Sequence, residues 1–112
     1  MKAIVEIDAG VCGFKTKASA SSEDCQNATF EITTDCPKIE KYIVALRSKE
    51  PVDAYNEINP NSQSVILSTA RESSVHCCMS CVVPLGLFKA MQSACGLALS
   101  KDITIKMIKE SN

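Results

Sequence analysis

The stretch "ATFEITTDCPKIEKYIVALRSKE", residues 28–50, changes its apolar period part-way along. In "ATFEITT" every second residue is apolar, which predicts a strand that buries one face. In the remainder Ile39, Ile43 and Leu46 recur at helical spacing. Pro37 suits the first position of that helix, where its missing N–H costs nothing, and Cys36 then occupies the N-cap position. The stretch therefore predicts a strand that leads directly into a helix.

Towards the N-terminus the alternation continues. "MKAIVEIDAG" places Ala3, Val5 and Ile7 on one face, and "FKTKASA" alternates in the same way. Between them "DAGVCGF" has two glycines around Cys12, which indicates a tight reversal. The polar segment "SASSEDCQN", residues 19–27, is typical of a second turn. We therefore expect three strands in an antiparallel meander with one buried face.

Towards the C-terminus helical patterns dominate. Pro51 ends the first helix, residues 52–62 are expected to form a loop with a helical turn, and residues 62–74 favour a short helix over a strand. "CVVPLGLFKAMQSACGLAL", residues 81–99, predicts a longer helix with a stripe of Leu87, Met91 and Ala94 and with Gly96 as its C-cap. "DITIKMIK", residues 102–109, alternates again and predicts a last strand that joins the sheet.

The order of elements is then βββα(α)αβ. It predicts an α+β fold in which a mixed sheet of about four strands carries helices packed on one face. The 112 residues are one domain's worth, so we expect a single domain over residues 1–112.

Composition excludes several classes of function. The formal net charge is −1 and no basic run occurs, so nucleic acid is not an expected partner. We find no signal peptide and no apolar stretch near the ~20 residues that a membrane span needs, so we expect a cytoplasmic protein without membrane contact. A single histidine and no glycine-rich phosphate loop leave no basis for a hydrolytic triad or a nucleotide site.

Seven cysteines stand out in so short a chain, and three of them lie in "VHCCMSCVVP", residues 75–84. In a reducing cytoplasm this density points to metal binding or thiol chemistry rather than disulfides, and the odd count agrees with that interpretation. The alternative is that cysteine serves as a small buried hydrophobic residue.

The predicted topology sorts the cysteines by end of the sheet. Cys12 follows the first strand, Cys36 follows the third, and Cys78 and Cys81 lie at the start of the last helix. These four are expected at one end, whereas Cys25 and Cys95 are expected at the other. Helix N-termini stabilise thiolates, the form that binds metals and attacks electrophiles.

Four thiolates at one end match what zinc or an iron–sulfur cluster requires. The spacing of Cys78 and Cys81 lets two sulfurs from one turn reach one metal. His76 is a candidate to replace one of the four, although a lone histidine is more often a solvated or hydrogen-bonded surface residue. Cys77 diverges from its neighbour Cys78 and is assigned no role.

The motifs "CGF" (residues 12–14), "DCP" (35–37) and "SCVVPLGLFKAM…CGLALSKDITIK" (80–106) resemble a family of small uncharacterised proteins found in anaerobic bacteria and archaea. In that family the third motif usually has cysteine-proline-valine-proline, where this chain has Val82. The resemblance implies the motif cysteines Cys12, Cys36 and Cys81, and no established activity.

A second resemblance is to cytosolic sulfur carriers, which also place a cysteine-proline pair at a helix start after a strand. Three hypotheses follow. The first is a metal or iron–sulfur protein that acts in metal or cluster binding or in electron transfer, with a protein partner in redox or cluster handling. The second is a thiol-based sulfur carrier or redox protein that uses Cys36 or Cys81 as its nucleophile. The third is a structural α+β domain with core cysteines.

Overall fold

The three long strands come first along the chain and most of the helices follow them, as the sequence periods indicate. The computed structural model describes residues 1–73 and 80–111. Its elements are β1 (Lys2–Asp8), the 3-10 helix η1 (Gly10–Cys12), β2 (Lys15–Ser21), β3 (Asn27–Thr34), α1 (Pro37–Arg47), β4 (Val52–Asp53), α2 (Ala54–Ile58), α3 (Val65–Ser73) and α4 (Val83–Ala94). The expected α+β class is confirmed.

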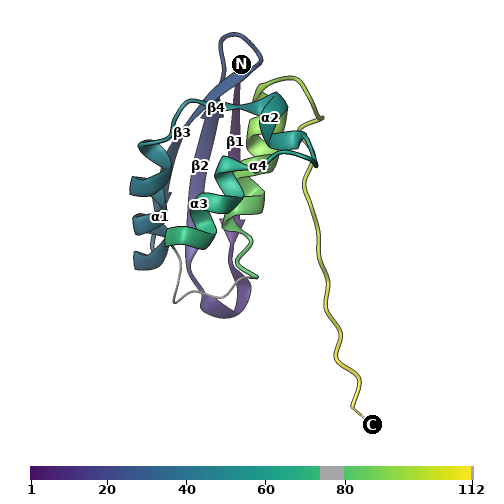
Figure 1. Ribbon diagram of the computed structural model, residues 1–112. Coiled ribbons are helices and arrows are strands. Elements are labelled where there is room, and N and C mark those ends of the chain that lie inside the picture. Colours follow the sequence, from purple (N-terminus) through teal and green to yellow (C-terminus); the bar gives the residue numbers. More distant parts are fainter. Residues whose placement is uncertain (74–79, 112) are drawn as a thin grey trace.

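The four strands lie in the order β1-β2-β3-β4, and each neighbouring pair is antiparallel (Figure 1). The predicted meander of β1, β2 and β3 is therefore confirmed. The fourth strand is the two-residue β4, which pairs Val52 with Ala28 and Asp53 with Asn27. The expected mixed sheet is wrong for the described residues, because the parallel strand expected at the C-terminus is not part of it.

Residues 102–109 are the source of that error. They carry the predicted alternation, yet the segment is extended and exposed, with Ile103 55% and Ile105 69% accessible to solvent. Figure 1 shows the chain leaving the end of α4 and running clear of the sheet and the helices. Alternation indicates a capacity to bury one face against a sheet, and it does not by itself provide the partner strand.

Three helices cover one face of the sheet. α4 packs on β1 and β2, α1 packs on β3, and α3 contacts both α1 and α4 (Figure 1). Small side chains in the sheet let the helices approach closely, and larger ones fill the space between the layers. The core includes Ala18, Ala20, Ala28 and Phe30 from the sheet, Ile39, Tyr42 and Leu46 from α1, Ile66 from α3, and Leu87, Met91 and Ala94 from α4.

Local capping explains where the helices begin and end. α1 begins with Pro37 at its first position after Cys36 at the N-cap, as predicted. After α4, Gly96 adopts a φ of 73°, the left-handed conformation that a C-terminal cap requires. α3 confirms the preference for a helix over a strand in residues 62–74.

Candidate functional site

One end of the sheet collects three of the sequence-predicted cysteines. β1 ends there, and η1 turns the chain into β2 with Cys12 as its last residue. Gly10 and Gly13 both adopt positive φ, and the Gly13 N–H donates to the Gly10 carbonyl, which makes the tight reversal that the sequence predicted. The side chain of Asp8 accepts the Gly10 N–H at 2.9 Å. This hydrogen-bonded turn holds the exposed Cys12 at the end of the sheet where β1 finishes.

Cys36 reaches the same end from β3. The Asp35 N–H donates to the Lys15 carbonyl and closes the β2–β3 ladder at this point. The Cys36 N–H donates to Thr34 Oγ1 at 3.2 Å, and Thr34 Oγ1 shares a 2.8 Å hydrogen bond with Thr16 Oγ1. Cys36 is 9% exposed and makes no side-chain cap hydrogen bond to α1. Its sulfur is therefore a buried group at the start of a helix, held by a fully bonded backbone.

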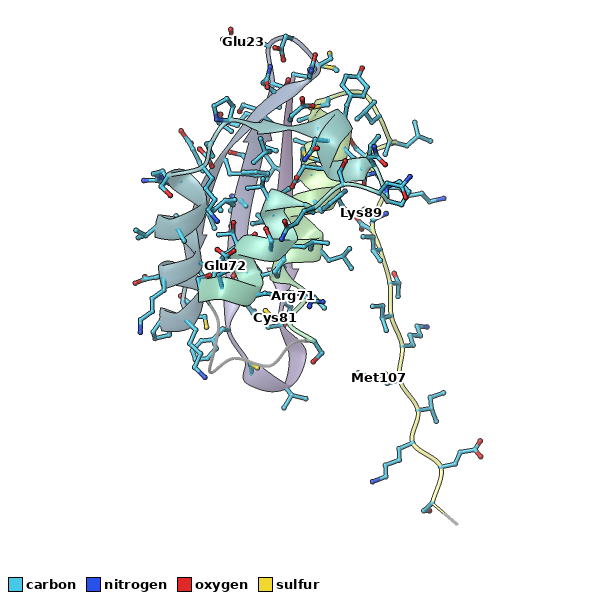
Figure 2. The ribbon with its side chains drawn as sticks, viewed as in Figure 1. Glu23, Arg71, Glu72, Cys81, Lys89 and Met107 are labelled. Carbon is cyan, nitrogen blue, oxygen red and sulfur yellow. The ribbon has the colours of Figure 1, made fainter. Side chains whose placement is uncertain are left out.

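Cys81 reaches this end from the third segment, two residues before α4. Figure 2 places it at the lower end of the sheet and helices. It is half-buried and packs against the core. The pKa of the Tyr42 hydroxyl in α1 is raised, first by burial and then by electrostatic interaction with Glu57 and Cys81. Cys81 thus lies at the end of the sheet where α1 and α4 both begin.

The other two described cysteines lie at the opposite end, as the topology predicted. Cys25 is exposed in the loop between β2 and β3, where it adopts a φ of 60°. Cys95 is buried directly after α4, beside Gly96, whose Cβ position would lie 3.4 Å from Met1 Cε. Neither belongs to the end formed by Cys12, Cys36 and Cys81.

The ligand set predicted from the sequence is not complete in what the structure describes. Cys78, His76 and Cys77 lie outside the described residues. Within residues 1–73 and 80–111, no three His, Cys, Asp or Glu side chains lie close enough together to hold a metal ion. Cys12, Cys36 and Cys81 lie at the same end of the fold, but they are not close enough together to form a metal site.

Sequence reasoning did not predict a cluster around Glu57, which is 4% exposed. Its carboxylate accepts hydrogen bonds from the Val65 N–H and the Ile66 N–H, each at 2.7 Å, and from the Ser64 hydroxyl at 3.0 Å. All of these donors belong to the start of α3. This carboxylate acts as a helix cap, and the only signal for it in the sequence is the serine that precedes the apolar run of α3.

A shallow hollow adjoins this cluster. Its lining includes Leu67, Ser68 and Arg71 of α3, Phe88 of α4 and most of the segment 57–64. A second hollow lies on the open face of the sheet and mixes acidic and basic side chains, among them Asp8, Lys15, Lys17 and Asp35. Neither hollow brings together a nucleophile and a base. The end of the sheet that carries Cys12, Cys36 and Cys81 therefore remains the candidate site.

A family model described as a family of unknown function, DUF6951, matches residues 3–107. The chain belongs to this family. The match extends from β1 to the exposed C-terminal segment, and it fits the resemblance to small uncharacterised proteins without bearing on the cysteine motifs. No curated protein and no solved structure matches the chain. No helix in the described part of the chain is long and apolar enough to cross a membrane.

Proposed function

We propose that this protein binds a thiophilic metal centre, zinc or an iron–sulfur cluster, at the end of the sheet formed by η1 and the starts of α1 and α4. The observation that carries the proposal is the sorting of the cysteines. Cys12, Cys36 and Cys81 come from three segments far apart in the sequence and lie at one end, whereas Cys25 and Cys95 lie at the other.

Ligand chemistry supports a centre at this end. Zinc and iron–sulfur clusters both take four ligands from thiolates and imidazoles. Cys12, Cys36 and Cys81 provide three, and Cys78 is the fourth ligand that the sequence proposes, with His76 as the candidate replacement. α1 and α4 both begin at this end, and the positive ends of their dipoles stabilise thiolates. Binding would draw the three sulfurs, which are apart in the described chain, onto one centre.

The burial of Cys36 favours a ligand over a nucleophile. A nucleophilic sulfur must be reached by its substrate, and Cys36 is only 9% exposed. A metal ligand gains from the same burial, because a shielded thiolate–metal bond is protected from water and oxidants. The role that we propose is metal or cluster binding, or electron transfer with a protein partner.

Metal content and substitution test the proposal directly. The full chain purified without oxygen should contain stoichiometric zinc, or iron with acid-labile sulfide and a visible absorption band. Cys12→Ser, Cys36→Ser and Cys81→Ser should each lose most of that metal. Cys25→Ser and Cys95→Ala are the matched controls from the opposite end and should retain it. Equal retention in all five variants would contradict the proposal.

Alkylation distinguishes the metal site from thiol chemistry. If the sulfurs share a centre, Cys12, Cys36 and Cys81 should resist iodoacetamide until a chelator removes the metal, and should then react together. Mass spectrometry of each cysteine before and after chelation measures this. A single fast-reacting cysteine that ignores the chelator would instead support a sulfur carrier or redox protein.

A further inference from the structure

The exposed C-terminal segment, residues 99–111, is here called the tail. It begins beside the last turn of α4, where the hydroxyls of Ser93 and Ser100 share a hydrogen bond. From there it runs clear of the body in the same general direction as β1 (Figure 1). Ile103 and Ile105 are more than half exposed, and Met107 is 88% exposed. A segment of six residues, "ITIKMI", with strand-forming side chains and a single charge is a strong candidate for pairing with an open sheet edge.

β1 offers such an edge. It stands at the end of the sheet order, and β2 is its only strand partner among the described residues. Met1 and Ser22 exchange both backbone hydrogen bonds, and the Ala9 N–H donates to the Phe14 carbonyl. Because hydrogen-bonded pairs alternate along an antiparallel ladder, the odd-numbered residues of β1 bond to β2. The even-numbered ones direct their N–H and C=O groups to the open edge, and they are Lys2, Ile4, Glu6 and Asp8.

The tail and this edge are complementary in one parallel register. Placing Asp102 beside Lys2 also places Lys106 beside Glu6, so two pairs of opposite charge form on the solvent face of the sheet. The same register brings Ile103, Ile105 and Met107 alongside the odd-numbered residues of β1, on the face that the helices cover.

Those odd-numbered residues have room for such neighbours. Ala3 and Val5 are only half-buried beneath α4, although their side chains face the helices. An additional strand at this edge would cover them. The family match spans residues 3–107 and therefore includes both β1 and the alternating part of the tail.

We propose that the tail of one copy pairs as a parallel fifth strand with β1 of a second copy, and that the exchange is reciprocal and closes a two-fold dimer. A single chain carries both the edge and the strand. Its Gly96, shortly before the tail, lies next to Met1, yet the tail and the edge remain apart. A second copy presents the same edge to the tail. Reciprocal exchange covers both edges and both apolar faces, and it leaves no free end for further growth.

The first test is the oligomeric state of the full chain and of tail variants. Light scattering after size exclusion, from micromolar to millimolar protein, should show a dimer. Ile105→Asp places a charge at the strand interface and should weaken the dimer by about 100-fold or more. Thr104→Asp is the matched control, because it adds the same charge on the solvent face, and should weaken the dimer by less than about tenfold. A monomer over the whole concentration range would overturn the proposal.

A charge swap tests the register without threatening the fold, since both side chains are exposed. Glu6→Lys should weaken the dimer by about tenfold, and adding Lys106→Glu should restore it. Failure of the second change to restore what the first one lost would overturn the parallel register.

Mixing variants separates exchange from two other arrangements. Ile4→Pro removes an N–H from the open edge and no bond to β2, so far-ultraviolet circular dichroism should match that of the wild type. An equimolar mixture of Ile4→Pro and Ile105→Asp chains should form a heterodimer, because one intact tail meets one intact edge. A mixture that stays monomeric would show that the tail docks on its own chain. Retention of the dimer by Ile105→Asp alone would show direct pairing of β1 with β1. Either result would overturn the proposal.

Discussion

Asp24 organises the loop between β2 and β3 through four hydrogen bonds. Its carboxylate accepts the N–H groups of Gln26 and Asn27, the Asn27 side-chain amide and the Ser22 hydroxyl. These donors favour the charged carboxylate, and the bonds from Asn27 are the largest cause of a strong lowering of the Asp24 pKa. The loop, in which Cys25 adopts a left-handed backbone, thus depends on an ionised Asp24.

The lowered pKa predicts a pH dependence. A carboxyl group whose pKa falls on folding contributes stability that is present above its unfolded value, about 4, and is lost as the pH falls below that value. The stability advantage of the wild type over Asp24→Asn should therefore shrink between neutral and strongly acidic pH. Urea unfolding at a series of pH values measures it. Glu23→Gln, at the neighbouring position, is the control and should show no such trend. An advantage that stays constant with pH would contradict this account of the loop.

At the scale of elements, Gly86 sets the distance between α4 and β1. A Cβ at this position would overlap Ile7 Cδ1 and would lie 2.9 Å from Ile7 Cγ1. The helix therefore packs on the strand through its own backbone at this point, and the glycine is explained by close packing rather than by a turn. This contact holds the start of α4, with Cys81 just before it, against the end of β1.

We predict that Gly86→Val destabilises the fold by about 1–3 kcal/mol, because it overpacks the contact with Ile7. In an Ile7→Ala background the same substitution should cost less, with a coupling free energy of about 1 kcal/mol or more. Urea denaturation of the four proteins of this cycle gives the value. Leu85→Val, at the exposed neighbouring position, should change the free energy of unfolding by less than about 1 kcal/mol. Additive effects of the two substitutions would contradict the proposed contact.

Elements with a regular apolar period and short connections could be predicted from the sequence, including the antiparallel meander of β1, β2 and β3, whereas the pairing of the fourth strand could not. The helical stripes predicted α1 and α4, because each buries a face over several turns, whereas α3 was preferred over a strand on its helix-forming residues Ala70, Arg71 and Glu72. β4 was missed, since two residues carry no period. The segment 102–109 has the alternation expected of a strand, but it has no partner strand in the described chain. A pattern within one segment does not reveal whether such a partner exists.

For the candidate site, too, one part could be predicted from the sequence and another could not. Counting strand directions placed Cys12 and Cys36 at one end and Cys25 at the other. Cys81 and Cys95 were placed through the direction of an expected last strand that the described sheet lacks, although both lie at the expected ends. Distances between sulfurs depend on side-chain directions and on how deeply each residue is buried, so counting gave no measure of them. Cys36 illustrates the difference, since its N-cap position was predicted and its burial was not.

At the scale of the whole molecule, α3 is held over the core by side chains from both neighbouring helices. The Tyr42 hydroxyl of α1 donates to the Ile66 carbonyl at 2.9 Å. From the other side, Glu57 of α2 binds the first N–H groups of α3. Near the C-terminal end of α3, Lys49 donates to the Thr69 hydroxyl and pairs with Glu72 at 3.1 Å. These contacts bind the helical layer together above the sheet, and the buried ones should account for most of their combined effect on stability.

Two glutamate substitutions test that ranking. Glu57→Ala removes a buried carboxylate and leaves the N–H groups of Val65 and Ile66 without their acceptor, so we expect a loss of about 2–3 kcal/mol in the free energy of unfolding. Glu72→Ala, the control, breaks only the solvent-exposed pair with Lys49 and should cost at most about 1 kcal/mol. Urea denaturation gives both values, and amide exchange should show faster opening of α3 in Glu57→Ala alone. Equal losses in the two variants would mean that the buried cap is no stronger than a surface ion pair, and α3 would then owe its position to apolar packing alone.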